Sequence, residues 1–230
     1  MTYVLTIDGP AGAGKSSTAR RLARRLGIRY LDTGAIYRAV ALLLDEAGIQ
    51  PSEEDAVRRA LAGARVELRD EGILLNGLDV SRKIRTPRID RVVSAYSALP
   101  CVRSALLGLQ RDQAKYGSLV VEGRDAGSVV FPDAPLKFFL TASPEARARR
   151  RCLEREAKGE DVSYEETLSA IRERDRFDSS RETAPLRRPE GAVLPEDQVL
   201  LDTSDMSEDE VVECFEGLVR DAVRRGDVEE

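Results

Sequence analysis

Two hydrophobic patterns alternate along most of the chain. Short apolar runs such as residues 3–7 (YVLTI) predict buried strands, whereas segments such as residues 16–26, in which apolar residues recur at helical spacing until Gly27, predict helices. Further strands are predicted at residues 28–31, 118–121, 136–140 and 199–201. Further helices are predicted at residues 35–47, 52–62 and 100–115, and beginning near residues 86, 143, 163 and 207. This alternation, with near-continuous apolar strands, is typical of an α/β protein whose parallel sheet is covered on both faces.

The alternation of strand and helix is interrupted at Ala64. From there the residues alternate between apolar and polar and contain the turn signals Asp-Glu-Gly and Asn-Gly, as a small antiparallel meander would. We therefore expect an insertion in the α/β framework. Two helix starts, Ser52-x-x-Asp55 and Ser207-x-x-Glu210, have the form of a capping box.

Composition limits the chemistry more than it limits the fold. The chain of 230 residues has no histidine and only three cysteines, which argues against Ser-His-Asp or Cys-His catalysis and against a zinc centre. The formal net charge of −5 argues against a general nucleic-acid binder. No apolar run is long enough to span a bilayer and the N-terminus lacks the pattern of a signal peptide, so we expect a cytoplasmic protein.

A phosphate-binding motif follows the first predicted strand and precedes the first predicted helix. The spacing Gly9-x-x-x-x-Gly14-Lys15-Ser16 is that of a P-loop, in which backbone N–H groups surround phosphate oxygens. Lys15 is expected to reach the β- and γ-phosphates, and Ser16 to bind Mg²⁺. The residues predicted to bind the nucleoside triphosphate are Gly9, Pro10, Ala11, Gly12, Ala13, Gly14, Lys15, Ser16 and Ser17.

The P-loop leaves the class of reaction open, but two classes fit poorly. A GTPase would need an Asn-Lys-x-Asp motif, and Asn76, the only asparagine, is followed by Gly. A motor ATPase would need a strand that ends in Asp-Glu. Here the predicted strand at residues 118–121 is followed by Glu122-Gly123-Arg124-Asp125 instead. Among these classes of P-loop protein, a phosphotransferase fits the sequence better than the other two.

Several segments have the residues that an anionic acceptor would need. Asp32–Arg38 joins a strand to a helix, where a capping hydroxyl and free N–H groups face one point, and Gly123-Arg124-Asp125 follows another strand. Arg174, Asp178 and Arg181 share one helix face. Taken alone, the first two segments could equally be an ordinary helix cap and a structural ion pair, and the third is better explained as a solvated ion-pair face.

The predicted helix after residue 143 carries an excess of arginine. Arg147, Arg151 and Arg155 form a stripe that Arg149 and Arg150 extend around the helix. A mobile lid that closes over a triphosphate would explain like charges on all sides.

Together these segments resemble the bacterial cytidylate kinases, of the nucleoside monophosphate kinase group. The resemblance runs through TIDGPAGAGKSS, YLDTGAIYR, VVEGRDAGSVVFPDAPLKFFLTASPEARARRR and IRERDRFDSSRETAPL, over roughly residues 2–205. It implies a three-layer α/β/α P-loop NTPase fold with a five-stranded parallel sheet, a CMP-binding insert of antiparallel strands plus helices, and a helical lid. The implied single domain, 1–230, divides into a core (1–63, 97–142 and 178–230), an insert (about 64–96) and a lid (about 143–177).

The resemblance also implies roles for individual residues. Residues implied to hold the acceptor phosphate are Thr33, Tyr37, Arg38, Arg124 and Arg181. Residues implied to read cytosine are Ser94, Arg103 and Asp125, and those implied to contact the pentose hydroxyls are Arg174 and Asp178. The loop 203–206 would lie near the adenine of ATP. Residues expected to neutralise charge during catalysis are Lys15, Arg124, Arg151 and Arg181.

The expected reaction is transfer of the γ-phosphoryl group of ATP, with Mg²⁺, to CMP or dCMP. The acceptor phosphate is already ionised at neutral pH, so no general base is needed. One alternative is a P-loop kinase for UMP, AMP or a hydroxy acid. A hydroxyl acceptor would need a carboxylate base, and Asp32 or Asp125 could be that base. Another is a non-catalytic nucleotide-binding module. We expect a monomer with no nucleic-acid or membrane partner.

Overall fold

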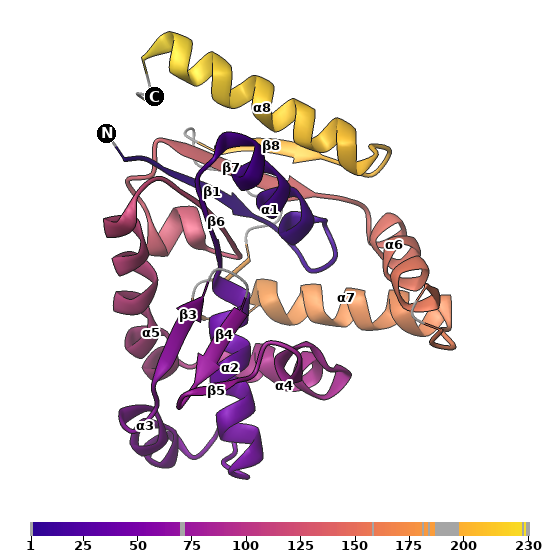
Figure 1. Ribbon diagram of the computed structural model, residues 1–230. Coiled ribbons are helices and arrows are strands. Elements are labelled where there is room, and N and C mark those ends of the chain that lie inside the picture. Colours follow the sequence, from indigo (N-terminus) through magenta and orange to yellow (C-terminus); the bar gives the residue numbers. More distant parts are fainter. Residues whose placement is uncertain are drawn as a thin grey trace.

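Five parallel strands form the central sheet, in the spatial order β2-β6-β1-β7-β8 (Figure 1). The computed structural model describes residues 2–69, 72–157, 159–180, 182–183, 185–186, 198–226 and 228. The strands are β1 (Val4–Asp8), β2 (Arg29–Asp32), β6 (Leu119–Gly123), β7 (Leu136–Thr141) and β8 (Gln198–Asp202). The chain passes from β1 to one edge of the sheet and later to the other, so the strand order reverses beside β1. Ligands of such sheets bind at the carboxyl ends of the strands near this reversal.

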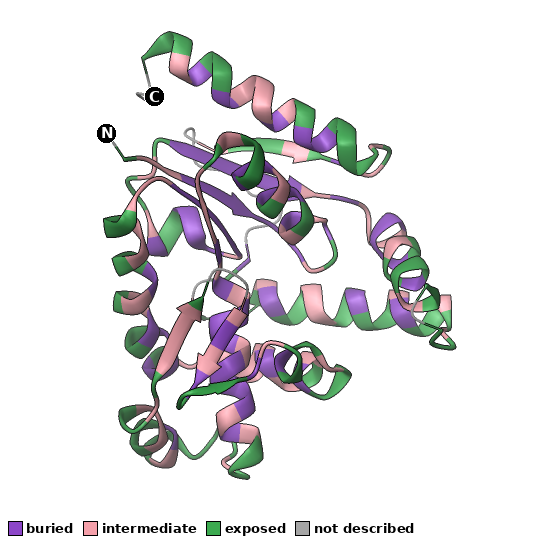
Figure 2. Ribbon diagram, viewed as in Figure 1, coloured by how far each residue is buried: buried purple, intermediate pink, exposed green. Residues whose placement is uncertain are grey.

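Alternating side chains of the strands enter two hydrophobic clusters. On one face, α1 (Lys15–Leu26) and α8 (Glu208–Arg225) cover Leu5, Val120 and Phe138. Phe138 meets Phe215 of α8 edge to face, with ring centroids 4.7 Å apart. Leu119 belongs to the cluster on the opposite face, which explains why β6 is buried along its whole length (Figure 2).

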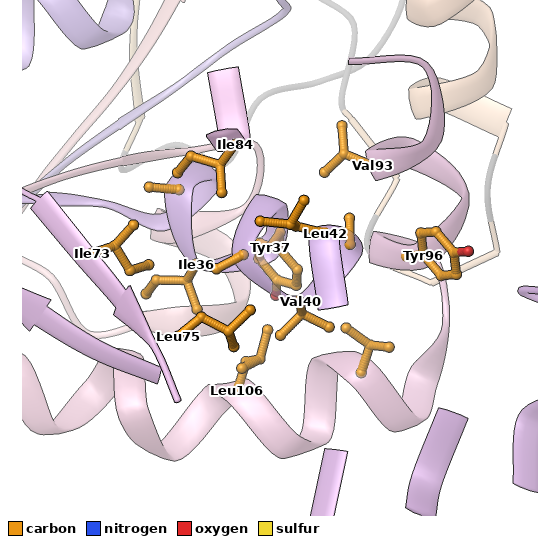
Figure 3. Close-up of a cluster of buried hydrophobic side chains, with 14 of the residues drawn as sticks. Ile36, Tyr37, Val40, Leu42, Ile73, Leu75, Ile84, Val93, Tyr96 and Leu106 are labelled. Atoms are coloured by element: carbon orange, nitrogen blue, oxygen red, sulfur yellow. The ribbon is translucent and has the colours of Figure 1, made fainter. Parts of the chain in front are cut away.

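The second cluster packs around α2 (Thr33–Glu46), which is buried on most sides. Figure 3 shows Ile36 and Val40 of this helix beside side chains of three other elements, which include Ile73 of β4 (Gly72–Leu75), Val93 of α4 (Pro87–Ser97) and Leu106 of α5 (Pro100–Asp112). The predicted insert therefore shares its hydrophobic core with α2.

The predicted meander is present. Strands β3 (Val66–Arg69), β4 and β5 (Leu78–Asp79) form an antiparallel sheet in that order. Asn76 and Gly77 join β4 to β5 with φ of 52° and 81°, the positive values that a two-residue type I′ turn requires. Asp70 and Glu71, the first two residues of the Asp-Glu-Gly signal, lie outside the described residues. Before the meander lies α3 (Glu54–Ala62), and between β5 and α4 lies the 3₁₀ turn η1 (Lys83–Arg85).

Two paired helices follow β7. In α6 (Pro144–Glu156), the hydroxyl of Ser143 accepts the N–H of Ala146, and in α7 (Tyr164–Ser180), the hydroxyl of Ser163 accepts the N–H of Glu166. Both helix starts were predicted. Helix α7 packs along α6 and also contacts α4 (Figure 1).

One predicted helix cap is wrong and one is confirmed. Glu53, with no capping side-chain bond, precedes α3, and its carboxylate instead accepts the N–H of Gln50, so Ser52 does not cap the helix. At α8 the full box forms between Ser207 and Glu210. The predicted helix 100–115 ends as an α-helix at Asp112 and continues as the 3₁₀ turn Gln113–Tyr116. The sequence patterns did not predict η1 or a π-helical turn over Ala126–Val130.

Among the described residues, no helix alone is long and apolar enough to cross a membrane, and the bent pair formed by α4 and residues 100–116 meets that test by length and composition only.

Candidate active site

A cavity of about 210 Å³ lies at the carboxyl ends of β2 and β6, between the P-loop and helices α2, α4, α6 and α7. Its described lining carries seven cationic side chains: Lys15, Arg38, Arg85, Arg103, Arg124, Arg151 and Arg174. It also carries four carboxylates: Asp32, Glu122, Asp125 and Asp178. This excess of positive charge in a recessed site favours an anionic ligand.

Glycines make the backbone path of the P-loop possible. Gly9 has a φ of 148°, and a Cβ there would lie 1.9 Å from the carbonyl oxygen of Leu140, so no side chain fits. Gly14, with a φ of 88°, precedes α1, whose first turn has no side-chain cap. The N–H groups of that turn are therefore left for an anion at the positive end of the helix dipole.

Lys15 lies inside the loop, where its Nζ donates to the carbonyl oxygen of Pro10 at 2.8 Å. The side chain is buried, and burial, followed by the nearby charge of Arg124, lowers the pKa of Lys15. The carboxylates of Glu122 and Asp8 oppose that shift. A bound polyphosphate would favour the charged ammonium form further.

Glu122, at the end of β6, is the carboxylate beside Ser16. It accepts the hydroxyl of Tyr30 at 2.5 Å and is also hydrogen-bonded to Ser16. Burial, followed by the charge of Asp32, raises the pKa of Glu122. The described residues contain no cluster of three or more acidic, Cys or His side chains that could hold a metal alone. A hydroxyl next to one carboxylate suits Mg²⁺ that takes most of its ligands from phosphate and water.

The junction of β2 and α2 differs in one detail from its prediction. The cap of α2 is the carboxylate of Asp32, which accepts the N–H of Ala35 at 2.8 Å, and not the hydroxyl of Thr33. The Thr33 hydroxyl donates to the carbonyl oxygen of Glu122 at 2.7 Å. Tyr37 lies under the Arg103 guanidinium, 5.4 Å from the ring centroid.

Two arginines of the site are fixed by buried carboxylates. Arg103 forms a short ion pair with Asp125, and both side chains are less than a tenth exposed. Arg124 donates to Asp178 of α7 at 3.1 Å and to the carbonyl oxygen of Gly9 at 3.0 Å. Arg124 therefore connects the P-loop with α7.

The structure brings the described residues predicted to bind the acceptor or to neutralise charge to one cavity, together with Ala11, Gly12 and Ser16 of the P-loop. The predicted P-loop residues that do not line it are Gly9, Pro10, Ala13, Gly14 and Ser17. The predicted side chains that line it are Lys15, Ser16, Thr33, Tyr37, Arg38, Ser94, Arg103, Arg124, Asp125, Arg151, Arg174 and Asp178. Arg181 lies outside the described residues. The lining also contains residues that were not predicted to bind ligand, among them Arg85, Ser97 and Glu122. Of these, Glu122 could have been anticipated, because it ends a predicted strand directly before Gly123-Arg124-Asp125.

Two arginines of the arginine-rich helix make internal contacts instead of lining the cavity. Arg147 is buried and bonds both Asp175 of α7 and the carbonyl oxygen of Ala11. Arg150 donates to the carbonyl oxygens of Thr203 and Met206. Of the five arginines in the predicted stripe, all of them described, Arg151 alone lines the cavity.

A parallel sheet with a P-loop at the switch in strand order, beside a cavity lined by arginines, defines a P-loop kinase. The family model for cytidylate kinase matches residues 5–220. A cytidylate kinase of Mycobacterium avium (strain 104) is 50% identical over 222 residues, which cover 94% of this chain and 95% of that protein. One from Caldanaerobacter subterraneus subsp. tengcongensis is 47% identical over 213 residues, which cover 93% and 92%. The chain belongs to the cytidylate kinase family, and it is an ATP-dependent kinase.

Among solved structures, an uncharacterized protein from Eubacterium ventriosum ATCC 27560 is similar, with a TM-score of 0.52 and 13% identity. The match covers 95% of this chain and 98% of that one. At this identity the likeness supports the fold alone.

Proposed function

We propose that the chain transfers the γ-phosphoryl group of ATP to the phosphate of CMP or dCMP, giving ADP and CDP or dCDP. The observation that carries this proposal is that Lys15 and Ser16 of the P-loop line the same cavity as the predicted acceptor residues. A donor phosphate on the loop and an acceptor phosphate on the arginines would therefore meet in one space. The family supplies the identity of the acceptor.

The acceptor phosphate would be held by Thr33, Tyr37, Arg38 and Arg124, with Arg181 as a further predicted contact. Arg124 is suited to this role because its bonds to Gly9 and Asp178 place it between the P-loop and α7. From there its charge can act on both phosphates.

The cytosine ring would be read by Ser94 and by the buried pair of Arg103 and Asp125. A carboxylate accepts from the exocyclic amino group of cytosine, and a guanidinium donates to its N3 and O2. Uracil has a carbonyl in place of that amino group, so it would oppose an acceptor to the Asp125 carboxylate. A polar pocket of this kind can reject the wrong base strongly, because a buried group is left unpaired. Arg174 and Asp178 would contact the pentose.

No general base is required, because the acceptor oxygen is already ionised. Lys15, Arg124, Arg151 and Arg181 would align the two phosphates and offset their mutual repulsion. The predicted Mg²⁺, when bound, neutralises charge on the β- and γ-phosphate oxygens. Ser16 would hold it, with the Glu122 carboxylate beside Ser16.

We further propose the predicted division into core, insert and lid. Arg38 comes from the core, whereas Arg151 comes from the proposed lid, so lid movement would assemble the cavity. The proposed boundary at residues 177 and 178 lies within α7. The loop 203–206 would lie near the adenine.

We propose a cytoplasmic monomer that acts on small molecules without nucleic-acid or membrane partners. Most exposed large apolar side chains of the described residues, such as Leu78, Tyr116 and Leu153, lie on separate elements, which gives little support to an interface. Light scattering should give a mass near 25.4 kDa, and twice that mass would contradict the proposal.

ADP release from ATP, measured with and without Mg²⁺, tests the reaction against CMP, dCMP, UMP, AMP, GMP and shikimate. Turnover should be confined to CMP and dCMP, with UMP far behind, and should require Mg²⁺. A Lys15→Ala protein prepared in parallel controls for contaminating kinases. Turnover with another acceptor would overturn the assignment of Ser94, Arg103 and Asp125, and ATP binding without turnover would indicate a binding module.

A further inference from the structure

One carboxylate that no motif predicted joins three arginines of the cavity wall. Asp90 lies on α4, and its Oδ1 accepts from Arg38 of α2 at 2.5 Å. Its Oδ2 accepts from Arg151 of α6 at 2.8 Å. A guanidinium nitrogen of Arg174 on α7 lies 3.6 Å from Oδ1. Helices α2, α6 and α7 are thus connected to α4 through one side chain.

Asp90 lies behind the arginines and not in front of them. All three arginines line the cavity, whereas Asp90 does not. Its side chain is 22% exposed, so the ion pairs are partly shielded from water. Burial acts to raise the pKa of Asp90, but the arginines, led by Arg38, together lower it, so the carboxylate is charged at neutral pH.

The three guanidinium groups would otherwise repel one another. Burial, and then the charges of neighbouring arginines, lower the pKa of Arg174 to about 10, whereas Asp90 and Asp178 act in the opposite direction. The Nε of Arg174 is buried and has no hydrogen-bond partner, and it lies 4.0 Å from Oδ2 of Asp178. Without a carboxylate at position 90, the repulsion between the guanidinium groups would not be offset, and Arg151 and Arg174 would be held less firmly at the cavity wall.

We propose that Asp90 is a positioning residue, which holds Arg38, Arg151 and Arg174 at the cavity wall in the geometry that binds the phosphate and the pentose of the acceptor. This inference rests on the proposed function, because it takes the acceptor to be a nucleoside monophosphate. Asp90 acts through the arginines and does not touch the acceptor. It also links the proposed lid to the insert and the core.

The test is Asp90→Asn, which keeps the shape of the side chain and removes its charge. Asp45→Asn is the matched control, because Asp45 also joins α2 to α4, through Arg88 at 2.5 Å, and is similarly shielded with 18% of its side chain exposed. Neither Asp45 nor Arg88 lines the cavity. We measure KM for CMP, KM for ATP and kcat, together with CMP and cytidine affinity by calorimetry and the melting temperature.

Asp90→Asn should raise KM for CMP about tenfold or more and leave KM for ATP within about twofold. The effect on CMP is expected to be large because the hydrogen bonds that are lost join charged groups and are stronger than neutral ones. CMP affinity should fall more than cytidine affinity, because cytidine lacks the phosphate that Arg38 would bind and keeps only the proposed pentose contact of Arg174. Asp45→Asn should change none of these values, even where it lowers the melting temperature. Asp90→Glu, which restores the charge one methylene further out, should give a KM between those of the Asn variant and the unchanged chain.

Equal weakening of CMP and cytidine, or an unchanged KM for CMP, would overturn the proposal. A lowered KM would overturn it as well, because it would show that Asp90 competes with the phosphate for the arginines. If Asp90→Asn does not fold, Asp90→Glu carries the test through the same selective loss of CMP over cytidine. Turnover of CMP by the unchanged chain is measured first, so that a failure of the proposed reaction is seen separately.

Discussion

The stability of an Asp8→Asn variant, measured relative to that of the unchanged chain, is expected to increase as the pH rises from 5 to 7. Asp8 ends β1 and is 2% exposed. Its carboxylate accepts the N–H groups of Ala126 and Gly127 at 2.7 and 2.8 Å. These bonds favour the charged form, but burial outweighs them and raises the pKa of Asp8 from 3.8 to about 6.

The sign follows from comparing proton binding in the two states. Between pH 3.8 and about 6 the unfolded chain has released the Asp8 proton and the folded chain has kept it. Rising pH therefore removes stability, by about 1.4 kcal/mol per pH unit within that interval and about 3 kcal/mol in total. Between pH 5 and 7 the same two pKa values give a loss of about 1.3 kcal/mol. An Asn at this position does not titrate and avoids the loss.

Urea denaturation at pH 5, 6 and 7 measures the difference in unfolding free energy between Asp8→Asn and the unchanged chain. That difference should shift in favour of the variant by about 1.3 kcal/mol over the series. Asp79→Asn is the control, because hydrogen bonds from Ser81 lower the pKa of this exposed carboxyl and keep its titration below the window. A difference for Asp8→Asn that is constant, or that moves against the variant, would refute the reasoning.

Three further substitutions test the site and the packing. Lys15→Ala should reduce kcat by orders of magnitude and leave CMP affinity largely intact in calorimetry; near-normal turnover would contradict the role of Lys15. Phe215→Ala should cost about 3–5 kcal/mol in urea denaturation, because Phe215 is fully buried against Phe138; a loss below about 1 kcal/mol would show that the cluster repacks. Ser207→Ala should cost about 1 kcal/mol by removing the cap of α8, and an unchanged transition midpoint would contradict that estimate.

The fold was predictable wherever the pattern of one segment decides its structure. The apolar run before Gly9 and the helical spacing after Gly14 predicted β1 and α1 within one residue at each end. The π-helical turn Ala126–Val130 was not predictable, because its first N–H groups are satisfied by Asp8, 118 residues away from Ala126. The wrong cap at Ser52 has a similar cause, since Ser, Asp and Glu are all frequent near helix starts and local sequence does not choose among them.

The site was predictable where its residues follow the strands of the parallel sheet. The P-loop follows β1, Thr33 follows β2 and Arg124 follows β6, and parallel strands bring their carboxyl ends to one edge. Asp90 follows no strand. Its place in the site depends on how α4 packs against α2 through side chains such as Val93, a tertiary contact that the amphipathic pattern of one helix does not specify.

The distribution of charge explains why composition alone says little about the substrate. The whole chain has a formal net charge of −5, which by itself would disfavour a polyanionic ligand. The described cavity lining nevertheless holds seven cations against four carboxylates, because parallel strands and paired helices direct arginines from distant segments to one point. Within such a recess the local potential decides binding, because charges farther away than the screening length, about 8 Å at physiological salt, contribute little. A carboxylate placed behind that wall, as Asp90 is, can therefore order the arginines while the wall that faces the cavity keeps its excess of positive charge.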